Sequence, residues 1–473
     1  MNVCFIAAKH MTHYFADVSR RLERKGHRVF WLSPSTRWTR WLMADGGVSR
    51  ERIMNLPDFA SEWKDAGARP RPSDVEELSV LEEADGLTIA HVTLMCRSLR
   101  ERPPGVAYAY LAALRRHMET FLRDSQIDVC FGEATWGFEI LTWMMCRQKR
   151  IRCVFPTTVR IPDDRFAFFD SYPHEILEIA SPTESDQIWA KEFLEKWTNR
   201  PTRPIFSRLI ASPFVFKSHW WTELAAGTLR AHEDQNDLTL WPLHARTFFR
   251  LRVAFNRIGI MGNLFQDSRI DQRFVLFPLH QQPEAAVDVL GAFNSNQAHF
   301  IEQISRILPA THQLWVKEHK DALGARSRAW FDQIARLPNV RLIDPEESTF
   351  DLIRRADLLV TITGTSAYEA SLLGTPSATA GSVFFSKIAT LSGSLYRSPL
   401  NWPLREILQT PPTKDVMRSN ALEFLAWLHA QSFPGTPFDR VTVPNSARGD
   451  ADIDAEAEAF DTFLQWPDLR PAA

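Results

Sequence analysis

Short apolar runs alternate with amphipathic helical stretches throughout the C-terminal half of this 473-residue chain. The first run, RFVLFPLH, and the last, DLLVTI, read as buried strands, and each run is followed by apolar residues at helical spacing. Strict alternation of this kind is typical of a parallel sheet with helices on both faces. The predicted strands are residues 273–280, 312–317, 339–344 and 357–362, and the predicted helices are residues 298–308, 327–337, 348–356 and 366–374.

The N-terminus shows the same pattern. Residues 2–8 predict a strand, residues 9–15 read as a polar-aromatic loop, and an amphipathic helix over 16–26 leads to a second strand at 27–34. This is the βαβ opening of a doubly wound sheet. The glycine fingerprint GxGxxG of dinucleotide-binding folds is absent.

Two further segments of the N-terminal half resemble Rossmann units. Residues 127–146 predict a strand, a turn and a helix, and residues 151–169 predict a strand followed by a long loop. We therefore expect an α/β fold with two Rossmann-like domains facing a cleft, the GT-B architecture, with extra helices. In such folds, ligands bind at the carboxyl ends of the strands, in the crevice between the domains.

Charge and cysteine content argue against several classes of protein. A net charge of −2 and a pI near 6.7 provide no general attraction for nucleic acid. The five cysteines form no CxxC pair, and Cys4 and Cys130 lie in apolar runs, which indicates reduced, buried thiols in a cytoplasmic protein. The first apolar run is too short for a signal peptide, and no stretch reaches about 18 uninterrupted apolar residues, so we expect no transmembrane helix.

Trp, Phe and Arg side chains gather in the predicted helices of residues 183–260. Packing of these helices on the neighbouring domain explains this composition. The alternative is a basic-aromatic surface that contacts the inner membrane leaflet, which would make the cytoplasmic protein peripheral to that membrane.

The stretch TITGTSAYEASLLGTP, residues 361–376, joins a predicted strand to a predicted helix. Free N–H groups and the helix dipole suit an anionic group at such a corner, and several hydroxyls add donors. The segment SAYE also fits the capping box S-x-x-E, so helix capping alone explains the same residues. The candidate phosphate-binding residues are Thr363, Gly364, Thr365, Ser366 and Glu369.

Polar residues also follow two other strands of the predicted sheet. His280 and Gln282 come after the first strand, and Lys317 and His319 after the second. Taken singly, each segment is explained by an ordinary polar surface loop. Because the carboxyl ends of parallel strands meet at one edge of the sheet, we expect the three loops to line one crevice.

The N-terminal half offers candidates for acid–base or nucleophilic chemistry after its own strands. The candidate catalytic residues are Glu133, Asp163 and His10, and the candidate acceptor-binding residues are His13, Arg160 and Asp164. In the alternative interpretation, Asp163 and Asp164 pair with Arg160 and Arg165 in a turn. No HExxH, paired-Cys or DxD element is present, so we expect neither a metal site nor a cofactor.

The C-terminal third resembles the capsular polysaccharide biosynthesis family of bacteria, over roughly residues 273–385. His280-Gln281-Gln282-Pro283 is similar to the family's Gln-Pro motif, and Lys317-Glu318-His319 is similar to its His-Pro motif, although the chain has Lys320 where the family has proline. The third element runs from Thr363 through Glu369 to Gly374 and Pro376, and it is shared with UDP-sugar enzymes and epimerases of GT-B fold.

The resemblance implies a metal-independent GT-B transferase that uses a CMP-activated acidic sugar, 3-deoxy-manno-octulosonic acid (Kdo). Gln282, Lys317 and His319 would contact the donor phosphate or sugar carboxylate. Thr365 and Ser366 would hold the phosphate, and Glu369 the ribose.

The sequence is thus interpreted as a glycosyltransferase that transfers a sugar from a nucleotide donor to a glycan or glycolipid of the bacterial surface. We assign residues 1–182 to an N-terminal acceptor domain, 183–265 to a helical insertion or linker, 266–430 to a nucleotide-sugar domain, and 431–473 to a tail or helix. One alternative is a UDP-sugar transferase or UDP-sugar 2-epimerase. Another is a non-catalytic polysaccharide-binding or assembly protein.

Overall fold

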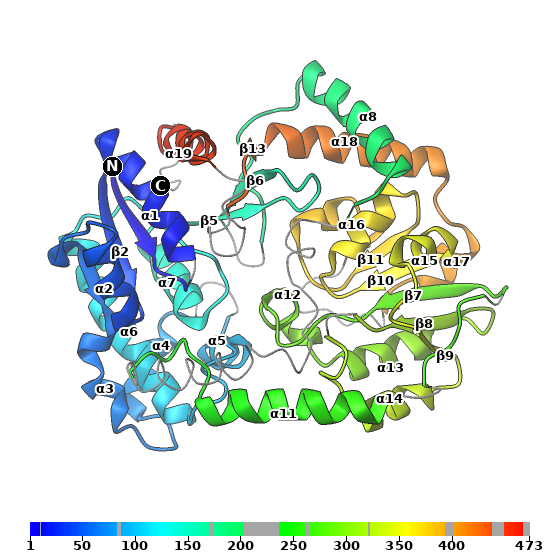
Figure 1. Cartoon of the computed structure of the whole chain (residues 1–473), viewed down its shortest axis with the longest axis horizontal. Helices are drawn as coiled ribbons and strands as arrows, with labels where there is room; N and C mark the ends of the chain where they lie inside the picture. The colour runs from blue at the N-terminus through cyan, green and yellow to red at the C-terminus, as the bar shows by residue number, and fades with distance from the viewer. Residues whose placement is uncertain are drawn as a thin grey trace. The chain divides into compact units, whose positions relative to one another are not determined.

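The chain divides into two compact units (Figure 1). Unit 1 comprises residues 1–172, 217–247 and 432–473, and unit 2 comprises residues 173–216 and 248–431. The structure is a computed structural model of the chain. It describes residues 1–9, 11–82, 87–170, 174–202, 236–260, 264–269, 271–319, 322–392, 401–437 and 449–466.

The sheet of unit 1 has the strand order β13-β6-β5-β4-β1-β2-β3. The five strands from β5 to β3 pair in parallel, whereas β6 pairs antiparallel with both β5 and β13. The order 3-2-1-4-5 of the parallel part is that of a doubly wound sheet. The strands are β1 (Asn2–Ile6), β2 (Arg28–Ser33), β3 (Ile53–Asn55), β4 (Val129–Phe131), β5 (Arg152–Thr158), β6 (Arg165–Phe169) and β13 (Phe433–Pro434).

The sheet of unit 2 is parallel at every pair and has the order β12-β11-β10-β7-β8-β9. Counted along the chain, this is the order 3-2-1-4-5-6 of a Rossmann fold. Two Rossmann-like domains are therefore confirmed, while a cleft between them stays a prediction. The strands are β7 (Phe274–Pro278), β8 (Gln313–Lys317), β9 (Val340–Ile343), β10 (Leu358–Thr361), β11 (Ser377–Thr379) and β12 (Leu391–Ser392).

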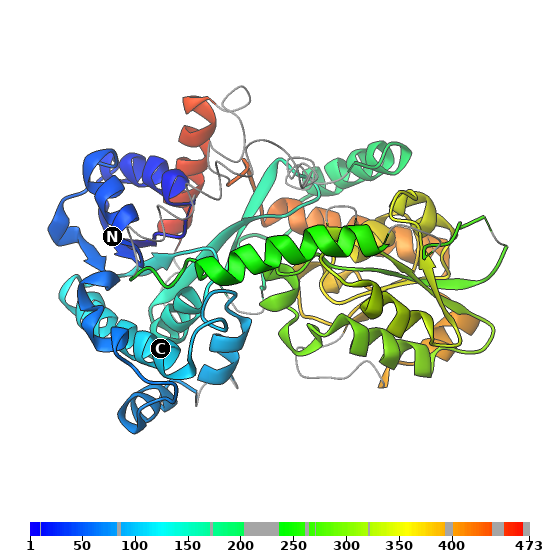
Figure 2. The same ribbon diagram turned by 60° about the horizontal axis from the view of Figure 1, so that its bottom comes forward.

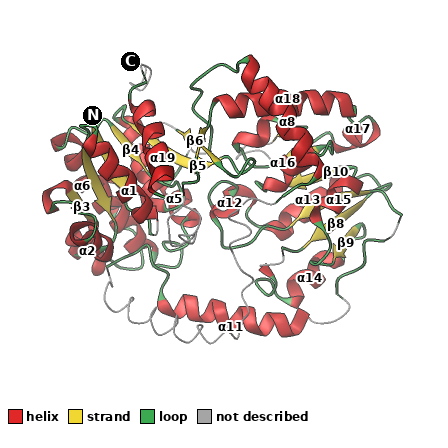
Figure 3. Ribbon diagram, turned by 45° about the horizontal axis from the view of Figure 1, so that its top comes forward, coloured by secondary structure: helices red, strands yellow, loops and turns green. Residues whose placement is uncertain are grey.

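Helices cover both sheets. In unit 1 they are α1 (Met11–Arg24), α2 (Thr36–Ala44), α3 (Ser61–Lys64), α4 (Pro72–Ser79), α5 (Ile89–Met95), α6 (Pro104–Asp124), α7 (Gly137–Gln148) and α19 (Asp450–Leu464). In unit 2 they are α8 (Glu184–Asn199), α12 (Ala285–Asp288), α13 (Gln297–Ile307), α14 (Arg328–Ala335), α15 (Thr349–Arg355), α16 (Thr365–Leu372), α17 (Leu404–Gln409) and α18 (Lys414–Ala430). Figure 3 shows α8 lying beside α18. Helix α11 (Leu243–Ile260) begins in unit 1 and continues in unit 2.

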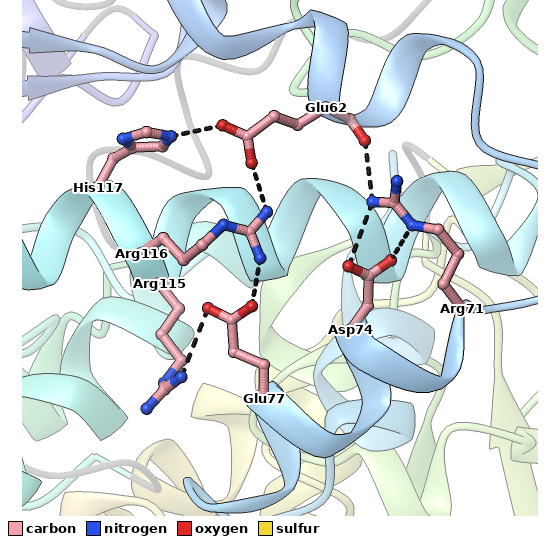
Figure 4. A network of polar contacts seen from close by, with 7 residues as sticks. All are labelled: Glu62, Arg71, Asp74, Glu77, Arg115, Arg116 and His117. Atoms are coloured by element: carbon pink, nitrogen blue, oxygen red, sulfur yellow. Dashed lines mark hydrogen bonds and ion pairs between the residues drawn. The ribbon is translucent and has the colours of Figure 1, made fainter.

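A polar network joins the helices on one side of unit 1 (Figure 4). Glu62 of α3 accepts hydrogen bonds from His117 and Arg116 of α6, and Arg116 also bonds Glu77 of α4. Burial opposes ionisation of Glu62, but these two partners hold its pKa below the usual value. The other members of the network are Arg71, Asp74 and Arg115.

The C-terminal helix α19 completes the core of unit 1. It lies beside α1 in both views of the chain (Figures 1 and 2). Phe460 is fully buried, and its ring centroid lies 4.9 Å from that of Phe131 and 5.1 Å from that of Phe168. The acidic segment at the chain end is therefore a packed helix.

The expected alternation in unit 2 is confirmed, since each predicted strand and helix from β7 to α16 is present. Two expectations for unit 1 are wrong. Helix α1 begins at Met11, inside the predicted loop of residues 9–15, because its apolar side chains pack on the sheet. Residues 165–169, part of the predicted long loop, form β6, whose neighbour β13 lies more than 260 residues further along the chain.

The four-part division of the sequence differs from the two units. The predicted linker 183–265 contributes α8 and most of α11 to unit 2, and residues 203–235 lie outside the described part. Residues 432–473 lie in unit 1. Among the described residues, no helix is long and apolar enough to cross a membrane.

Candidate functional site

The strand order of unit 2 reverses between β7 and β10, so the loops that follow these two strands are neighbours. Such a switch point opens a crevice at the carboxyl ends of the strands. His280 follows β7, and Thr363 to Ser366 follow β10. The fold therefore brings these predicted donor-binding residues to the switch point of this sheet.

Hydrogen bonds join the two loops directly. The His280 ring nitrogen Nε2 lies 3.0 Å from the Thr361 hydroxyl oxygen and 3.4 Å from the Thr363 backbone nitrogen, which donates to it. The Thr361 hydroxyl oxygen in turn accepts the backbone N–H of Gly364 at 3.1 Å. Because Nε2 accepts the Thr363 N–H, the matching neutral tautomer carries its proton on Nδ1.

Gly364 is the residue before the first turn of α16, at φ −72°. A Cβ at this position would lie 2.6 Å from the Thr361 hydroxyl oxygen and 3.3 Å from a carbon of the His280 ring, so close approach requires glycine here. No side chain caps the helix, and the helix begins at Thr365. The capping-box interpretation of SAYE is therefore wrong, and Glu369 is buried in the second turn.

The remaining residues of the β10 loop differ in accessibility. Gly364, Thr365 and Ser366 are half-buried, and they carry the first N–H groups of α16. Thr363 is fully buried, and its hydroxyl donates to the Ala286 carbonyl. The half-buried three are thus the ones that can reach a ligand.

Gln282 is held inside its own loop. Its amide nitrogen donates to Asp288 at 3.1 Å and to the Ser295 carbonyl at 3.0 Å, and its amide oxygen accepts from Gln297 at 2.7 Å. Gln297 also accepts the backbone N–H of His280 at 2.8 Å. Gln297 therefore fixes both predicted residues of this loop.

Lys317 and its neighbours form a buried polar group at the end of β8. The Lys317 ammonium donates to the Pro345 carbonyl at 2.8 Å. Both carboxylate oxygens of the fully buried Glu318 accept hydrogen bonds from Arg326 Nη1 at 2.7 Å. Arg326 also donates to the His280 carbonyl. Burial raises the pKa of Glu318, against the opposing charge of Arg326. His319, half-buried, donates its N–H to Glu318 at 2.6 Å.

In unit 1, Glu133 follows β4 in a loop that a buried carboxylate holds in shape. Glu139 of α7 accepts the N–H groups of Glu133, Thr135 and Trp136 at 2.8, 2.9 and 3.1 Å. Burial, and then the charge of Glu133, raise the pKa of Glu139 to about 8, while the three N–H groups act in the opposite direction.

The other candidates of unit 1 lie elsewhere along the sheet. Asp163 and Asp164 are in the β5–β6 turn, where their carbonyls accept from Thr436 at 3.3 Å and from Gly435 at 2.8 Å. Arg160 adopts the left-handed φ of 70° in the same turn. The Arg165 guanidinium bonds Ser432.

His13 lies on α1, with its ring 4.2 Å from Trp41 and 5.2 Å from Trp38. His10 lies outside the described residues. Within the described ranges, no group of three or more His, Cys, Asp or Glu side chains is placed to hold a metal ion.

Sequence reasoning missed Gln297, Arg326, Thr361 and Glu139. The first two lie in or near loops, where nothing periodic distinguishes them from surface residues. Glu139 was detectable, because an acidic residue three positions into a helix commonly accepts the N–H groups at the helix start.

Residues 261–398 match the model of the family described as capsule polysaccharide biosynthesis protein. The similar solved structures include the following three, all with low TM-scores. Thermosulfurimonas dismutans KpsC, a beta Kdo 2,7 transferase, has 11% identity and a TM-score of 0.33, covering 74% of this chain and 90% of that one. The UDP-GlcNAc 2-epimerase of Neisseria meningitidis has 10% identity and a TM-score of 0.25, covering 98% and 99%. The calicheamicin glycosyltransferase CalG4 has 14% identity and a TM-score of 0.28, covering 94% and 99%.

At these scores we draw nothing about the donor from the solved structures. None of the curated proteins compared with the chain matches it. The family match, by contrast, contains every predicted donor-binding residue, from His280 to Glu369. The predicted resemblance is confirmed there: residues 261–398 carry the signature of the capsule polysaccharide biosynthesis protein family.

Proposed function

We propose that this chain is a glycosyltransferase of bacterial surface polysaccharide synthesis, with its nucleotide-sugar donor bound to unit 2. One observation carries the proposal. The half-buried N-terminus of α16, Gly364-Thr365-Ser366, lies at the switch point between β7 and β10, inside the segment that matches the family. Backbone N–H groups and the helix dipole at such a terminus favour a phosphate.

Accessibility supports the donor-binding roles of Thr365, Ser366 and His319. Thr365 and Ser366 would donate hydroxyl bonds to the phosphate, and His319 would contact the phosphate or sugar carboxylate. The family resemblance alone assigns the ribose to Glu369, which is buried. The helix terminus would also stabilise the negative charge of the leaving phosphate, without requiring a metal ion. Gln282, Lys317 and Thr363 would act mainly by holding the loops, because their polar groups bond within the fold.

The acceptor and the acid–base chemistry would belong to unit 1. Glu133, Asp163 and His10 remain the proposed catalytic residues, and His13, Arg160 and Asp164 the proposed acceptor-binding residues. We favour a CMP-linked acidic sugar as the donor. The family resemblance of the His280 and Lys317 loops supports this choice.

Nucleotide binding tests the proposal in the full chain. CMP at about ten times its Kd should stabilise the protein by about 1.4 kcal/mol and raise Tm by several degrees. Ser366→Asp should abolish that shift, since the new charge repels phosphate while favouring the helix terminus. Ala329→Asp is the matched control, because Ala329 is the exposed second residue of α14.

A donor screen separates the alternatives. Turnover of a UDP-sugar but of no CMP-sugar would replace the CMP donor with the UDP-sugar transferase or epimerase. Absence of any Tm shift with CMP and UDP at millimolar concentration would instead favour a non-catalytic polysaccharide-binding or assembly protein.

We also propose that α11 brings the protein to an anionic membrane surface. Phe248, Leu251, Phe255 and Ile258 repeat at spacings of three and four, and they are 67%, 43%, 72% and 68% exposed. Residues 243–260 include four arginines and no acidic residue. An apolar helix face on a cationic helix is suited to anionic lipid headgroups.

Vesicle sedimentation tests the membrane contact. The full chain should bind vesicles containing phosphatidylglycerol and not vesicles of phosphatidylcholine alone, and the double variant Phe255→Ser/Ile258→Ser should lose binding. Val416→Ser, at an exposed apolar residue of α18, is the control. Concentration-dependent dimerisation that the double variant abolishes, without vesicle binding, would assign the face to a second copy of the chain.

A further inference from the structure

The sheet of unit 1 has a switch point of its own, between β1 and β4. Lys9 follows β1, and the loop from Glu133 to Trp136 follows β4. The same topological argument that places a ligand in unit 2 therefore predicts a ligand at these two loops. Glu133, a candidate from the sequence, lies in the second of these loops.

Two cations lie over one indole ring at this point. The Lys9 ammonium is 4.0 Å from the ring centroid of Trp136, and the Arg97 guanidinium carbon is 4.6 Å from it. Trp136 is buried, whereas both cationic residues are partly accessible. Stacking on an indole leaves the hydrogen-bond donors of both cations able to serve an anion.

The charges of Asp237 and Glu133 act on Lys9 and partly offset the positive charge of this pair. Neither cation forms an ion pair in the part of the chain that the structure describes, and the Arg97 Nε atom is buried without a hydrogen-bond partner. A half-buried cation without a direct ion-pair partner is stabilised when a ligand supplies an anionic group. The site is thus suited to receive an anionic group.

The backbone at this site is held in a costly conformation. Lys9 has a left-handed φ of 47°, and Ala134 in the facing loop has a left-handed φ of 56°. Glu139 holds the second loop through three N–H groups. Such strain gathers where a binding site has to be preorganised.

We propose that Lys9 and Arg97, supported by Trp136, bind an anionic group of the acceptor, a carboxylate or a phosphate. That the bound anion belongs to a glycan acceptor rests on the proposed function, whereas the presence of an anion-binding site does not. Arginine would engage two oxygens side by side, and lysine would supply a single point charge. The glycan that unit 1 receives would accordingly be acidic or phosphate-bearing.

Titration calorimetry on the full chain tests the site with three probes: glucuronate, inorganic phosphate and glucose. Lys9→Gln and Arg97→Gln should each weaken binding of the anionic probe at least about tenfold, the usual size of a lost charged hydrogen bond. Arg123→Gln removes a charge from the exposed surface of α6 and should leave binding unchanged. Tighter binding of glucuronate indicates an acidic sugar, and tighter binding of phosphate indicates a phosphate-bearing acceptor.

A pH series provides the second measurement. Burial, and then the charge of Arg97, lower the pKa of Lys9 to about 8, against the opposing charges of Asp237, Glu133 and Cys96. Anion binding should therefore weaken between pH 7 and 9. Lys9→Arg, which keeps its charge, should remove this dependence while retaining affinity.

Two results would overturn the proposal: equal binding of the anionic probe by all four variants, or glucose bound as tightly as glucuronate. Binding of the anionic probe without a Tm shift for any nucleotide would support the anion site and contradict the proposed function. A Tm shift with a nucleotide but no binding of the anionic probe would support the nucleotide site and contradict the anion site.

Discussion

A single buried ion pair joins the loops of the candidate donor site. Glu318 and Arg326 are both nearly inaccessible, and Arg326 reaches across to the His280 carbonyl. Removing one partner of a buried pair leaves the other charge without compensation. The stability of this site should therefore depend on the pair more than on any exposed charge around it.

At the residue scale, we expect Arg326→Met to lower the free energy of unfolding by about 3–5 kcal/mol. Glu318 would then stay buried without its counter-charge. The double variant Arg326→Met/Glu318→Gln should recover part of the loss, because the uncompensated charge is gone. Denaturant unfolding monitored by circular dichroism measures both values.

Arg328→Met is the control for this prediction. Arg328 lies two residues away and forms an exposed i,i+4 pair with Asp332 at 3.0 Å, which contributes at most about 0.5 kcal/mol. Similar losses for Arg326→Met and Arg328→Met would contradict the assigned role of the buried pair.

The sequence predicted which loops hold polar residues but not how they pair. His280, Lys317 and Ser366 could be identified because each follows a strand. Arg326 belongs to a loop without periodicity, and its partner Glu318 reads in the sequence only as the middle residue of Lys317-Glu318-His319. The contact of Arg326 with the His280 carbonyl joins residues 46 apart in the chain, so it depends on the fold.

At the element scale, α8 begins with an acidic cap that also contacts α18. Asp186 accepts the backbone N–H of Thr183 at 2.7 Å and lies 2.6 Å from the His429 ring nitrogen. Burial opposes ionisation, but the bonds from His429 and Thr183 lower the pKa of Asp186 to about 2. The ordinary value is 3.8.

A lowered carboxyl pKa stabilises the fold above the unfolded value and ceases to do so as pH falls through the folded value. Asp186 should therefore add about 2 kcal/mol at pH 7, and this contribution should disappear between about pH 4 and pH 2. Asp186→Asn should remove this contribution at neutral pH, and the free energy of unfolding of the variant should fall less between pH 4 and pH 2. Urea unfolding at pH 7 and pH 3 tests this expectation.

Glu192→Gln, on the exposed side of the same helix, should change stability little at either pH. If Asp186→Asn and Glu192→Gln behave alike, the cap does not stabilise α8. The cap is local, since Thr183 and Asp186 are three residues apart, whereas the contact with His429 depends on the fold, because 243 residues separate the two side chains.

At the scale of the whole molecule, the core of unit 1 depends on a helix from the chain terminus. Phe460→Ala should cost about 3–5 kcal/mol in unit 1, because its ring contacts aromatic residues of β4 and β6. Hydrogen exchange should rise over β1, β4 and β6, and nucleotide binding by unit 2 should persist. Thr462→Ala, exposed on the same helix, is the control.

The two Rossmann-like units could be predicted from local patterns alone, since alternation and helical periodicity identify strands and helices without tertiary contacts. The assignment of residues 432–473 to unit 1 could not. The sequence of α19 is acidic because acidic residues occupy its exposed face. Its buried phenylalanines follow the helical period of any amphipathic helix, which does not indicate where the helix packs. What β13 and α19 pack against depends on pairing over hundreds of residues.

The discontinuity of unit 1 also has a consequence for synthesis. Ribosomes add about 5–20 residues per second, so β13 and α19 follow β6 after roughly ten seconds to one minute. During that interval, the phenylalanines of β1, β4 and β6 have no cover from α19, whereas unit 2 is translated and free to finish folding. The buried aromatic face of β1, β4 and β6 is therefore expected to stay uncovered until α19 leaves the exit tunnel.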